Sequence, residues 1–515
     1  MSGLPPFNRL TMDKTLALNP NEVVSFLGKA PETFTCEDIL RFVCERGIRM
    51  IDFMYPAEDG RVKTLNFTVN SLAYAETVLV EGERVDGSSL FPSFIEAGNS
   101  DLYVIPRYRT AFVDPFNEIP TLCLLCDFYD KSGESFDCGP HATLMRAEKA
   151  FEASTGMQFE VMGELEYYVI CADDAKFPAT DQKGYHESEP FAKLNDFRRE
   201  CMDNVARTGG QIKYGHSEVG NFTLDGKVYE QNEIEFLPCP LDTAADQLLL
   251  AKWVIRNLAY RRGLDVSFAP KITMGKAGSG MHIHMRLMRD GRNVTLCAGG
   301  KLSDEARAAI AGLMTLAPSI TAFGNKNPIS YFRLVPHQEA PTNVCWGDCN
   351  RSALVRVPLG WSSGVDMCSR ANPLEGSVDR DTTSKQTFEM RSPDCSADVY
   401  QLMAGLCVAA RKGLEMPREE ALKLARETYV DMDIHKSENA ARLSTLKQLP
   451  SSCMQSADCL EKDRAVYEEE DVFRPRMIDG ILKALRAHHD EQLRHDAQSD
   501  AKLMRKLVAD VFYCG

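Results

Sequence analysis

Two glutamates stand two residues apart in residues 163–170 (GELEYYVI), a run otherwise made of strand-forming residues. Successive side chains of a β-strand point to opposite faces, so Glu164 and Glu166 are predicted to share one face. Two carboxylates about 4 Å apart repel by roughly 4 kcal/mol at an effective dielectric constant near 20. A fold that holds them together needs a shared proton, a basic partner or a divalent cation. The alternative is an exposed strand on which both carboxylates are solvated.

More carboxylates follow in residues 216–236, which read as a hairpin turning at Asp225-Gly226. Glu218 lies before the turn, and Glu233 and Glu235 follow it at strand spacing. This segment adds acidic groups to the first pair, unless it is simply a solvated hairpin.

An imidazole pair occurs in residues 270–285, where a glycine-rich loop leads into a strand that carries His282 and His284. A glycine-rich loop alone is weak evidence for phosphate binding, and paired histidines are often polar surface. Imidazoles beside carboxylates, however, suit a divalent cation, and carboxylate oxygens favour Mg²⁺ or Mn²⁺.

Four arginines lie further along the chain: Arg333, Arg351, Arg356 and Arg391. Guanidinium groups bind carboxylates and phosphates through two parallel hydrogen bonds, so this set indicates an anionic substrate. Glu339 lies among the first three, and Glu389 precedes Arg391 by two residues on a predicted strand. Ordinary salt bridges are the alternative for both.

The elements that position these residues belong to an ordinary globular chain of 515 residues, 44% apolar and 26% charged. Its net charge of −15 argues against a nucleic-acid or anionic-membrane surface. The N-terminus lacks the apolar core of a signal peptide, and no run approaches the roughly 18 apolar residues of a membrane span. We therefore expect a cytoplasmic protein whose 17 cysteines are reduced.

Two domains are expected, residues 1–138 and residues 139–515. The first reads as short strands after one amphipathic helix near residues 37–46. The second alternates strands with longer helices, predicted at residues 142–154, 191–207, 242–261, 303–316, 397–414 and 474–494. Within the first domain, residues 85–89 (VDGSS) read on their own as an ordinary turn.

The order of these motifs closely resembles the glutamine synthetase family, of the bacterial class I type. The resemblance covers nearly the whole chain, through VDGSS, DPF, GELEYYVI, QNEIEF, GSGMHIH, RLVPHQEAP, NRSALVRVP and FEMRSPD. It implies an α+β fold, with a small N-terminal β-grasp-like domain and a large catalytic domain built on a curved antiparallel sheet flanked by helices. It also implies ATP and two or three Mg²⁺ or Mn²⁺ ions as cofactors.

The resemblance also implies roles for the residues that match family motifs. One cation site resembles Glu166, Glu218 and Glu233; the other resembles Glu164, His282 and Glu389. By similarity Arg333 and Gly278 bind glutamate, and His284, Arg351 and Arg356 contact the nucleotide and its phosphates. Arg391 meets the γ-carboxylate as it becomes a phosphate, while Glu339 closes over the glutamyl end and helps to receive the amine.

In this family the Asp of VDGSS, here Asp86, reaches into the active site of a neighbouring subunit and takes a proton from ammonium. Ser89 lies beside it, and Tyr185 and Glu218 resemble members of the ammonium pocket. The resemblance therefore implies self-association into rings with active sites between subunits, and leaves hexamer and dodecamer open.

The predicted reaction is the ATP-dependent ligation of ammonia to the γ-carboxylate of glutamate. The alternatives are a γ-glutamyl-amine ligase that uses a polyamine or another primary amine, and a catalytically silent structural or sensing homologue. Several residues depart from the common pattern at the two substrate ends: Ala277 where many members have Asn, Lys213, Arg286, Thr387, and Ser217 in place of the second His of a pair. The hairpin before Glu233 is also longer than in familiar members.

Overall fold

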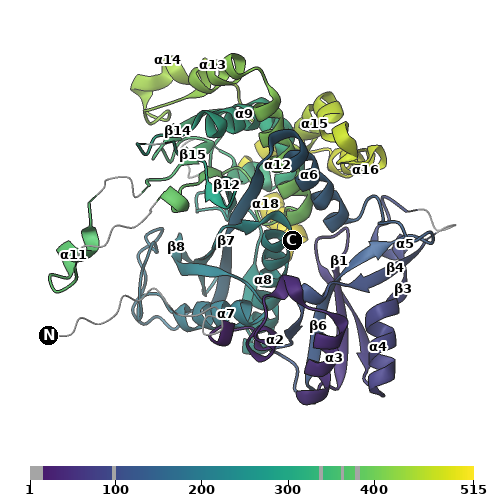
Figure 1. Ribbon diagram of the computed structural model, residues 1–515. Helices are drawn as coiled ribbons and strands as arrows, with labels where there is room; N and C mark the ends of the chain where they lie inside the picture. The colour runs from purple at the N-terminus through teal and green to yellow at the C-terminus, as the bar shows by residue number, and fades with distance from the viewer. Residues whose placement is uncertain are drawn as a thin grey trace.

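The computed structural model describes residues 16–95, 100–297, 299–335, 340–360, 365–376 and 383–514. Figure 1 shows a smaller N-terminal part beside a larger part that holds a long sheet and most of the helices. The predicted boundary at residues 138 and 139 falls between strand β6 (Thr121–Tyr129) and helix α6 (Pro140–Thr155).

The N-terminal sheet has the order β2-β1-β6-β4-β3, with β5 also pairing with β6. β1 and β6 run parallel and the other pairs are antiparallel. The remaining strands are β1 (Met50–Pro56), β2 (Val62–Thr68), β3 (Glu83–Asp86), β4 (Asp101–Pro106) and β5 (Phe112–Val113). The helices of this part are α2 (Glu22–Leu27), α3 (Cys36–Glu45), α4 (Leu72–Glu81) and the one-turn α5 (Gly87–Leu90). The predicted helix near residues 37–46 is α3, and it begins with a capping box formed by Thr35 and Asp38.

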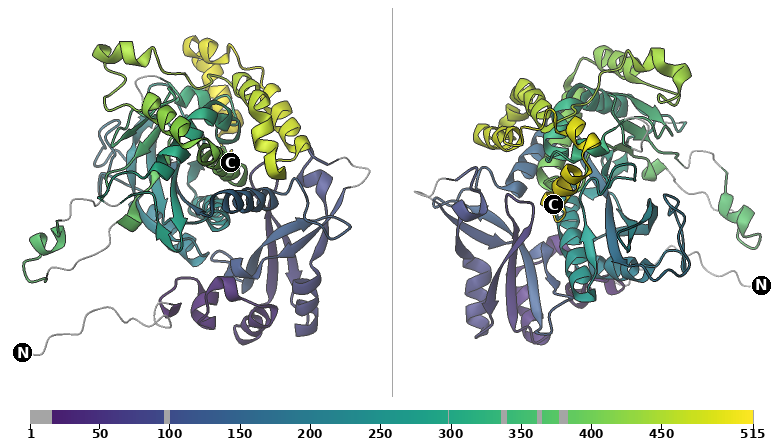
Figure 2. Two further views of the ribbon diagram at one scale, coloured as in Figure 1. Left: turned by 45° about the horizontal axis from the view of Figure 1, so that its top comes forward. Right: turned by 180° about the vertical axis from the view of Figure 1, so that it is seen from behind.

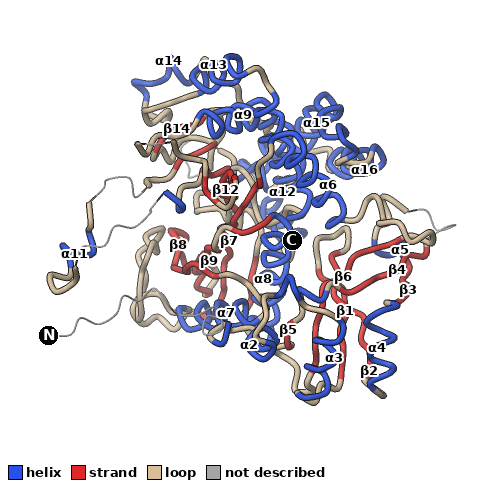
Figure 3. The backbone as a smooth tube through the Cα atoms, in the orientation of Figure 1, coloured by secondary structure: helices blue, strands red, loops and turns tan. Residues whose placement is uncertain are grey.

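The larger sheet has the order β14-β15-β16-β12-β7-β9-β8, and it is antiparallel except for the pair β14 and β15. The short strands β10 and β11 pair with β7, and β13 pairs with β12. The strands are β7 (Gln158–Ala172), β8 (Ile212–Leu224), β9 (Lys227–Phe236), β10 (Cys239–Pro240), β11 (Asp265–Ser267), β12 (Met281–Arg289), β13 (Arg292–Asn293), β14 (Trp346–Asp348), β15 (Val355–Val357) and β16 (Phe388–Met390). Figures 2 and 3 show this sheet curling, with helices packed around its outside, as expected.

Helices of the larger part include α7 (Asn195–Arg207), α8 (Leu241–Arg262), α9 (Asp304–Gly324), α10 (Ser330–Arg333), α11 (Met367–Ala371), α12 (Val399–Glu415), α13 (Arg418–Thr428), α14 (Ala440–Leu443), α15 (Cys453–Glu468), α16 (Pro475–Arg486), α17 (Leu493–Ser499) and α18 (Ala501–Val511). Within the described residues, α9 is the one helix apolar and long enough to cross a membrane. Its most apolar window is 78% buried inside the protein, which is the environment of a core helix. α9 packs against α12, α13 and α15.

Three helix predictions were wrong at their ends. The helix predicted over residues 303–316 is α9, which continues to Gly324 with Pro318 inside it. Residues 191–194 are not helical, because the N–H groups of Lys193 and Leu194 donate to the Glu230 carboxylate instead of starting α7. The helix predicted over residues 474–494 ends at Arg486, because Asp490 turns away to accept the first N–H groups of α15. All 17 cysteines are free.

Strand register brings the predicted site residues side by side. β7 is central, and it pairs Glu164 with His282 of β12 on one side and Glu166 with Glu233 of β9 on the other. β16 then places Glu389 opposite His284. Directly opposed residues of an antiparallel pair have Cβ atoms about 5 Å apart, so the backbone ladder itself gathers the acidic and imidazole groups.

The hairpin of β8 and β9 turns where the sequence predicted, with positive φ at Asp225 and Gly226. Its register is broken by a bulge: Ser217 pairs with Asn232, and the next pair is Asn221 with Glu230. β8 therefore has two more residues than β9 between these pairs. Glu218 lies inside this bulge.

Candidate functional site

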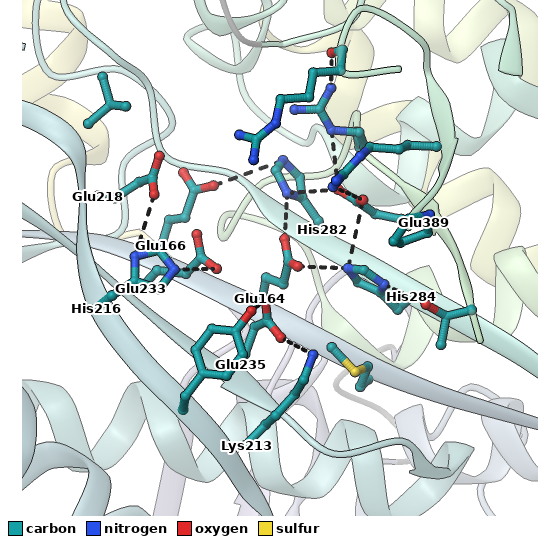
Figure 4. A pocket seen from close by; sticks show the side chains of 18 of the residues that line it. Glu164, Glu166, Lys213, His216, Glu218, Glu233, Glu235, His282, His284 and Glu389 are labelled. Atoms are coloured by element: carbon teal, nitrogen blue, oxygen red, sulfur yellow. Dashed lines mark hydrogen bonds and ion pairs between the residues drawn. The ribbon is translucent and has the colours of Figure 1, made fainter. Parts of the chain in front are cut away.

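Glu164 and Glu166 line one cavity of about 1100 Å³ formed by the larger sheet and the loops that follow its strands. Their side chains point into it in Figure 4. The residues are only 8% and 7% exposed, so they are not solvated strand residues. The cavity also receives the imidazoles and arginines that the sequence singled out: His282, His284, Arg333, Arg351, Arg356 and Arg391.

A first candidate cation site consists of Glu164, His282 and Glu389, whose ligand atoms lie within 4.8 Å of one another. His282 Nδ1 lies 2.8 Å from Glu164 Oε2 and 3.3 Å from Glu389 Oε1. His284 Nε2 lies 2.7 Å from the other Glu164 oxygen. Burial opposes ionisation of Glu164, but the two imidazoles outweigh it and hold the pKa of this carboxyl well below its usual range.

A second candidate cation site consists of His216, Glu218 and Glu233. His216 Nδ1 lies 3.7 Å from Glu218 Oε2, and its Nε2 lies 3.6 Å from Glu233 Oε1 (Figure 4). Burial, together with the neighbouring carboxylates Glu164 and Glu166, raises the pKa of Glu233 well above its usual value. Crowded buried carboxylates of this kind are strongly stabilised by a divalent cation, so the donor set fits Mg²⁺ or Mn²⁺.

The family resemblance grouped Glu166 with Glu218 and Glu233. In the structure Glu166 lies beside the cluster of His216, Glu218 and Glu233. One of its oxygens, Oε2, accepts hydrogen bonds from Gly280 N at 2.7 Å and Gln231 Nε2 at 3.1 Å. Its other oxygen, Oε1, lies 3.9 Å from His282 Nε2. Glu166 therefore stands between the two clusters.

Sequence reasoning missed two polar residues of the site, His216 and Gln231, and it named Glu235 only as one more carboxylate of the hairpin. His216 is a possible ligand, and its His-x-Glu spacing on a predicted strand was the available signal. Glu235 joins Glu164 and Glu233 in a third acidic cluster and pairs with Lys213 Nζ at 2.6 Å. Gln231 is 99% buried and its amide reaches the Glu166 carboxylate, a contact that no local sequence pattern indicates.

The arginines gather around the first cluster. Arg356 Nη1 and Arg391 Nε each donate to a Glu389 oxygen at 3.2 Å. Arg391 also donates to the backbone oxygen of Arg351, whose guanidinium lies 6.0 Å from the ring centre of Tyr185. Burial opposes the charged form of Arg351, but the hydrogen bond to Tyr185 and nearby carboxylates raise its pKa.

Arg333 lies at the base of the cavity, almost fully buried. It donates to backbone oxygens of Ser392 at 2.8 Å and of Arg391 at 3.2 Å. A Cβ on Gly278 would come within 2.9 Å of Arg333 Cγ, so the absence of a side chain lets the loop lie directly on this arginine. The predicted glutamate-binding residues Arg333 and Gly278 are thus in contact.

Asp86 and Ser89 do not line the cavity. Asp86 caps α5 and accepts hydrogen bonds from the hydroxyls of Ser89 at 2.6 Å and Ser88 at 2.7 Å, which lower its pKa to about 2. Figure 1 shows α5 on the outer side of the N-terminal part, away from β8. Glu339 lies outside the described residues.

Two residues that depart from the family pattern, Thr387 and Arg286, have side-chain partners. Thr387 Oγ1 lies 2.9 Å from His284 Nδ1, and Arg286 Nε donates to Glu160 Oε2 at 2.7 Å. With Glu164 against Nε2, both ring nitrogens of His284 have partners, which fixes the orientation of the ring.

Comparison with known families agrees with this arrangement. A family model described as "Glutamine synthetase, catalytic domain" matches residues 137–501, more than half of the chain. The chain belongs to the glutamine synthetase family. A second model of this family, "Glutamine synthetase, beta-Grasp domain", matches residues 47–131. The family is one of ligases that use ATP, divalent cations and small-molecule substrates, and its α+β fold with an N-terminal β-grasp domain is the one seen here.

Individual relatives match over most of the chain. A glutamine synthetase of Frankia alni is 30% identical over 493 residues, covering 89% of this chain and 96% of the relative. One of Mycolicibacterium smegmatis is 29% identical, covering 86% of this chain and 93% of the relative. A solved structure described as "Apo GmaS without ligand" superposes with a TM-score of 0.70 at 20% identity, covering 90% of this chain and 96% of that one. That last likeness concerns the fold alone.

Proposed function

We propose that this family member ligates ammonia to the γ-carboxylate of L-glutamate, using ATP and passing through γ-glutamyl phosphate. The observation that supports this most is that two candidate cation sites and four arginines open on one cavity. Phosphoryl transfer to a carboxylate requires in-line positioning and neutralisation of charge, and this set of residues can supply both.

In the first half-reaction, Arg351 and Arg356 bind the ATP phosphates and Arg333 binds a carboxylate of glutamate. Arg391 meets the γ-carboxylate of glutamate as a carboxylate oxygen attacks the γ-phosphorus of ATP, the bond to the β–γ bridging oxygen breaks and ADP leaves. Glu164, Glu166, Glu218, Glu233, His282 and Glu389 would hold the cations. When bound, these ions neutralise the phosphate charge and align the two reacting groups.

In the second half-reaction, an amine attacks the acyl phosphate and phosphate leaves. Tyr185 and Glu218 form the acceptor end of the cavity, where the carboxylate attracts ammonium. Asp86 of a neighbouring copy, held ionised by Ser88 and Ser89, accepts the proton that ammonium loses. This scheme requires ring-shaped oligomers in which α5 of one copy closes the cavity of the next.

The competing function is a γ-glutamyl-amine ligase, which differs only in the acceptor. It is favoured by the openness of the acceptor end, where Tyr185 is 47% exposed. A larger primary amine could enter there without changing the phosphoryl-transfer residues.

Phosphate release with L-glutamate and MgATP, measured with ammonium, polyamines or ethanolamine as acceptor, tests the proposal. We expect ammonium to give the highest kcat/KM. Turnover with a larger amine and none with ammonium would establish the competing function. No turnover with any acceptor, from protein that still binds ATP, would identify a catalytically silent homologue.

A further inference from the structure

The side chain of Gln182 reaches the cavity beside Ala277, a loop residue that has no polar side chain of its own. Gln182 lies in the connection between β7 and α7 and is half-buried. Its backbone N–H donates to Asn221 O at 2.8 Å, which attaches this connection to the bulged part of β8. The bulged part of β8 therefore helps to hold this side-chain amide beside Ala277.

The orientation of this amide follows from its partners. Ala277 N–H can only donate, so the Gln182 atom that lies 2.7 Å from it must be the carbonyl oxygen, Oε1. Nε2 then faces the other way, and its one contact among the described residues is Asn221 O at 3.4 Å. That contact uses at most one of the two N–H groups of Nε2. A hydrogen-bond donor remains for a molecule in the cavity.

Both Gln182 and the loop are held in place. Gln182 has φ 57°, a left-handed conformation that is unfavourable for a residue other than glycine. Residues kept in such conformations are concentrated at ligand sites. On the other side, Tyr168 donates its hydroxyl to Ala277 O at 2.8 Å, so both peptide groups of Ala277 have partners. The donor on Nε2 is therefore fixed before a ligand arrives.

We infer that Gln182 is a specificity-determining residue for the amino-acid substrate, and that its Nε2 donates a hydrogen bond to a substrate carboxylate oxygen. The next loop residue, Gly278, packs on the aliphatic part of the Arg333 side chain, and Gln182 and Arg333 line the same cavity. A carboxylate in this cavity can therefore meet both a guanidinium and an amide donor. A substrate amino group, which is itself a donor, does not match Nε2. This inference rests on the proposed function for the identity of the substrate.

Three variants separate substrate binding from loop support. Gln182→Ala removes the amide. Gln182→Glu keeps an oxygen for Ala277 N–H but replaces the donor with a second oxygen. Lys183→Ala removes the exposed neighbouring side chain and is the matched control.

Affinity for L-glutamate in the presence of MgADP, measured by calorimetry on the full-length oligomer, is the readout. We expect Gln182→Ala to weaken binding by about tenfold, equivalent to about 1.4 kcal/mol. Gln182→Glu should weaken it at least as much, because a carboxylate would face a carboxylate. Lys183→Ala should bind as wild type, and the KM for ATP should be unchanged in all three. Adding Ala277→Asn to Gln182→Ala should recover part of the affinity, because the new amide enters the cavity from the same loop.

Full affinity in Gln182→Glu would show that Gln182 only supports the loop, and full affinity in Gln182→Ala would show no role; either overturns the inference. Glutarate and L-aspartate are tested in parallel. A wild-type protein that ignores glutamate but binds one of these, with the same variant pattern, would refute the proposed function and retain the inference. A wild-type protein that binds no carboxylate would refute both.

Discussion

Replacing Glu166 by Gln should weaken cation binding strongly while leaving the fold intact. Gly280 N and Gln231 Nε2 both donate to the same Glu166 oxygen, Oε2. A glutamine can place its carbonyl oxygen there and keep both hydrogen bonds, with its amino group toward His282. Since no buried donor loses its partner, we expect the unfolding temperature to change by less than about 3 °C.

The loss of charge has a much larger effect. A carboxylate about 4 Å from a divalent cation contributes roughly 8 kcal/mol of attraction at an effective dielectric constant near 20. If hydration of the cation offsets two-thirds of this lost attraction, a net loss of about 2.7 kcal/mol remains, which corresponds to about a hundredfold weaker cation binding. Glu166 stands between the two candidate cation sites, 3.9 Å from the imidazole of the first, so kcat should fall with it.

Mn²⁺ titration followed by electron paramagnetic resonance measures the number and affinity of bound ions directly. Glu230→Gln is the control for loss of a buried charge on β9, because Glu230 does not line the cavity. Each Glu230 oxygen accepts one backbone N–H, so this variant also loses one of these two hydrogen bonds. It should bind Mn²⁺ as wild type. Unchanged Mn²⁺ stoichiometry and affinity in folded Glu166→Gln would refute the cation assignment.

Two further predictions concern assembly and pH. If active sites are shared between copies, Asp86→Asn and Glu166→Gln proteins should each be inactive alone. Co-assembled at equal amounts, they should regain about a quarter of wild-type activity, because about a quarter of the shared sites would then have both residues. Mixed rings that stay inactive would place Asp86 outside the site. Burial beside Asp242 and Glu152 raises the pKa of Glu148 from 4.5 to about 7. The folded state then binds the Glu148 proton more tightly than the unfolded state does. The contribution of this carboxyl to the free energy of unfolding is therefore fully present below pH 4.5 and is lost as pH rises to about 7. Glu148→Gln should raise the unfolding temperature at pH 8 by about 2 °C, allowing for partial exposure, and not at pH 4; equal shifts at both pH values would contradict this cause.

Strand periodicity was sufficient to predict which acidic and imidazole side chains share a face at the centre of the candidate site. The two-residue spacing of Glu164 and Glu166, and of His282 and His284, placed each pair on one face, and all four residues line the cavity. This worked because the alternation of side chains is a property of any extended backbone. The turn at residues 225 and 226 was predictable for a similarly local reason, the preference of Asp-Gly for positive φ.

The rest depended on contacts between distant segments. Gln182 and Ala277 are 95 positions apart, and Gln231 and Glu166 are 65 apart, so no local pattern relates them. The end of α16 at Arg486 depends on Asp490 reaching α15, again across the chain.

The bulge in β8 leaves the position of Glu218 less constrained by strand pairing than the positions of the other glutamates of the cavity. Glu164, Glu166 and Glu233 sit in continuous ladder pairs, so changing their spacing requires the strands to slip by whole residues. Glu218 lies in the bulge between the paired positions Ser217 and Asn221, where β8 has two more residues than β9. Glu218 therefore lies on a segment of β8 whose position is not fixed by strand pairing. Insertions in the bulge should move this one predicted cation ligand without changing the strand register of the other three.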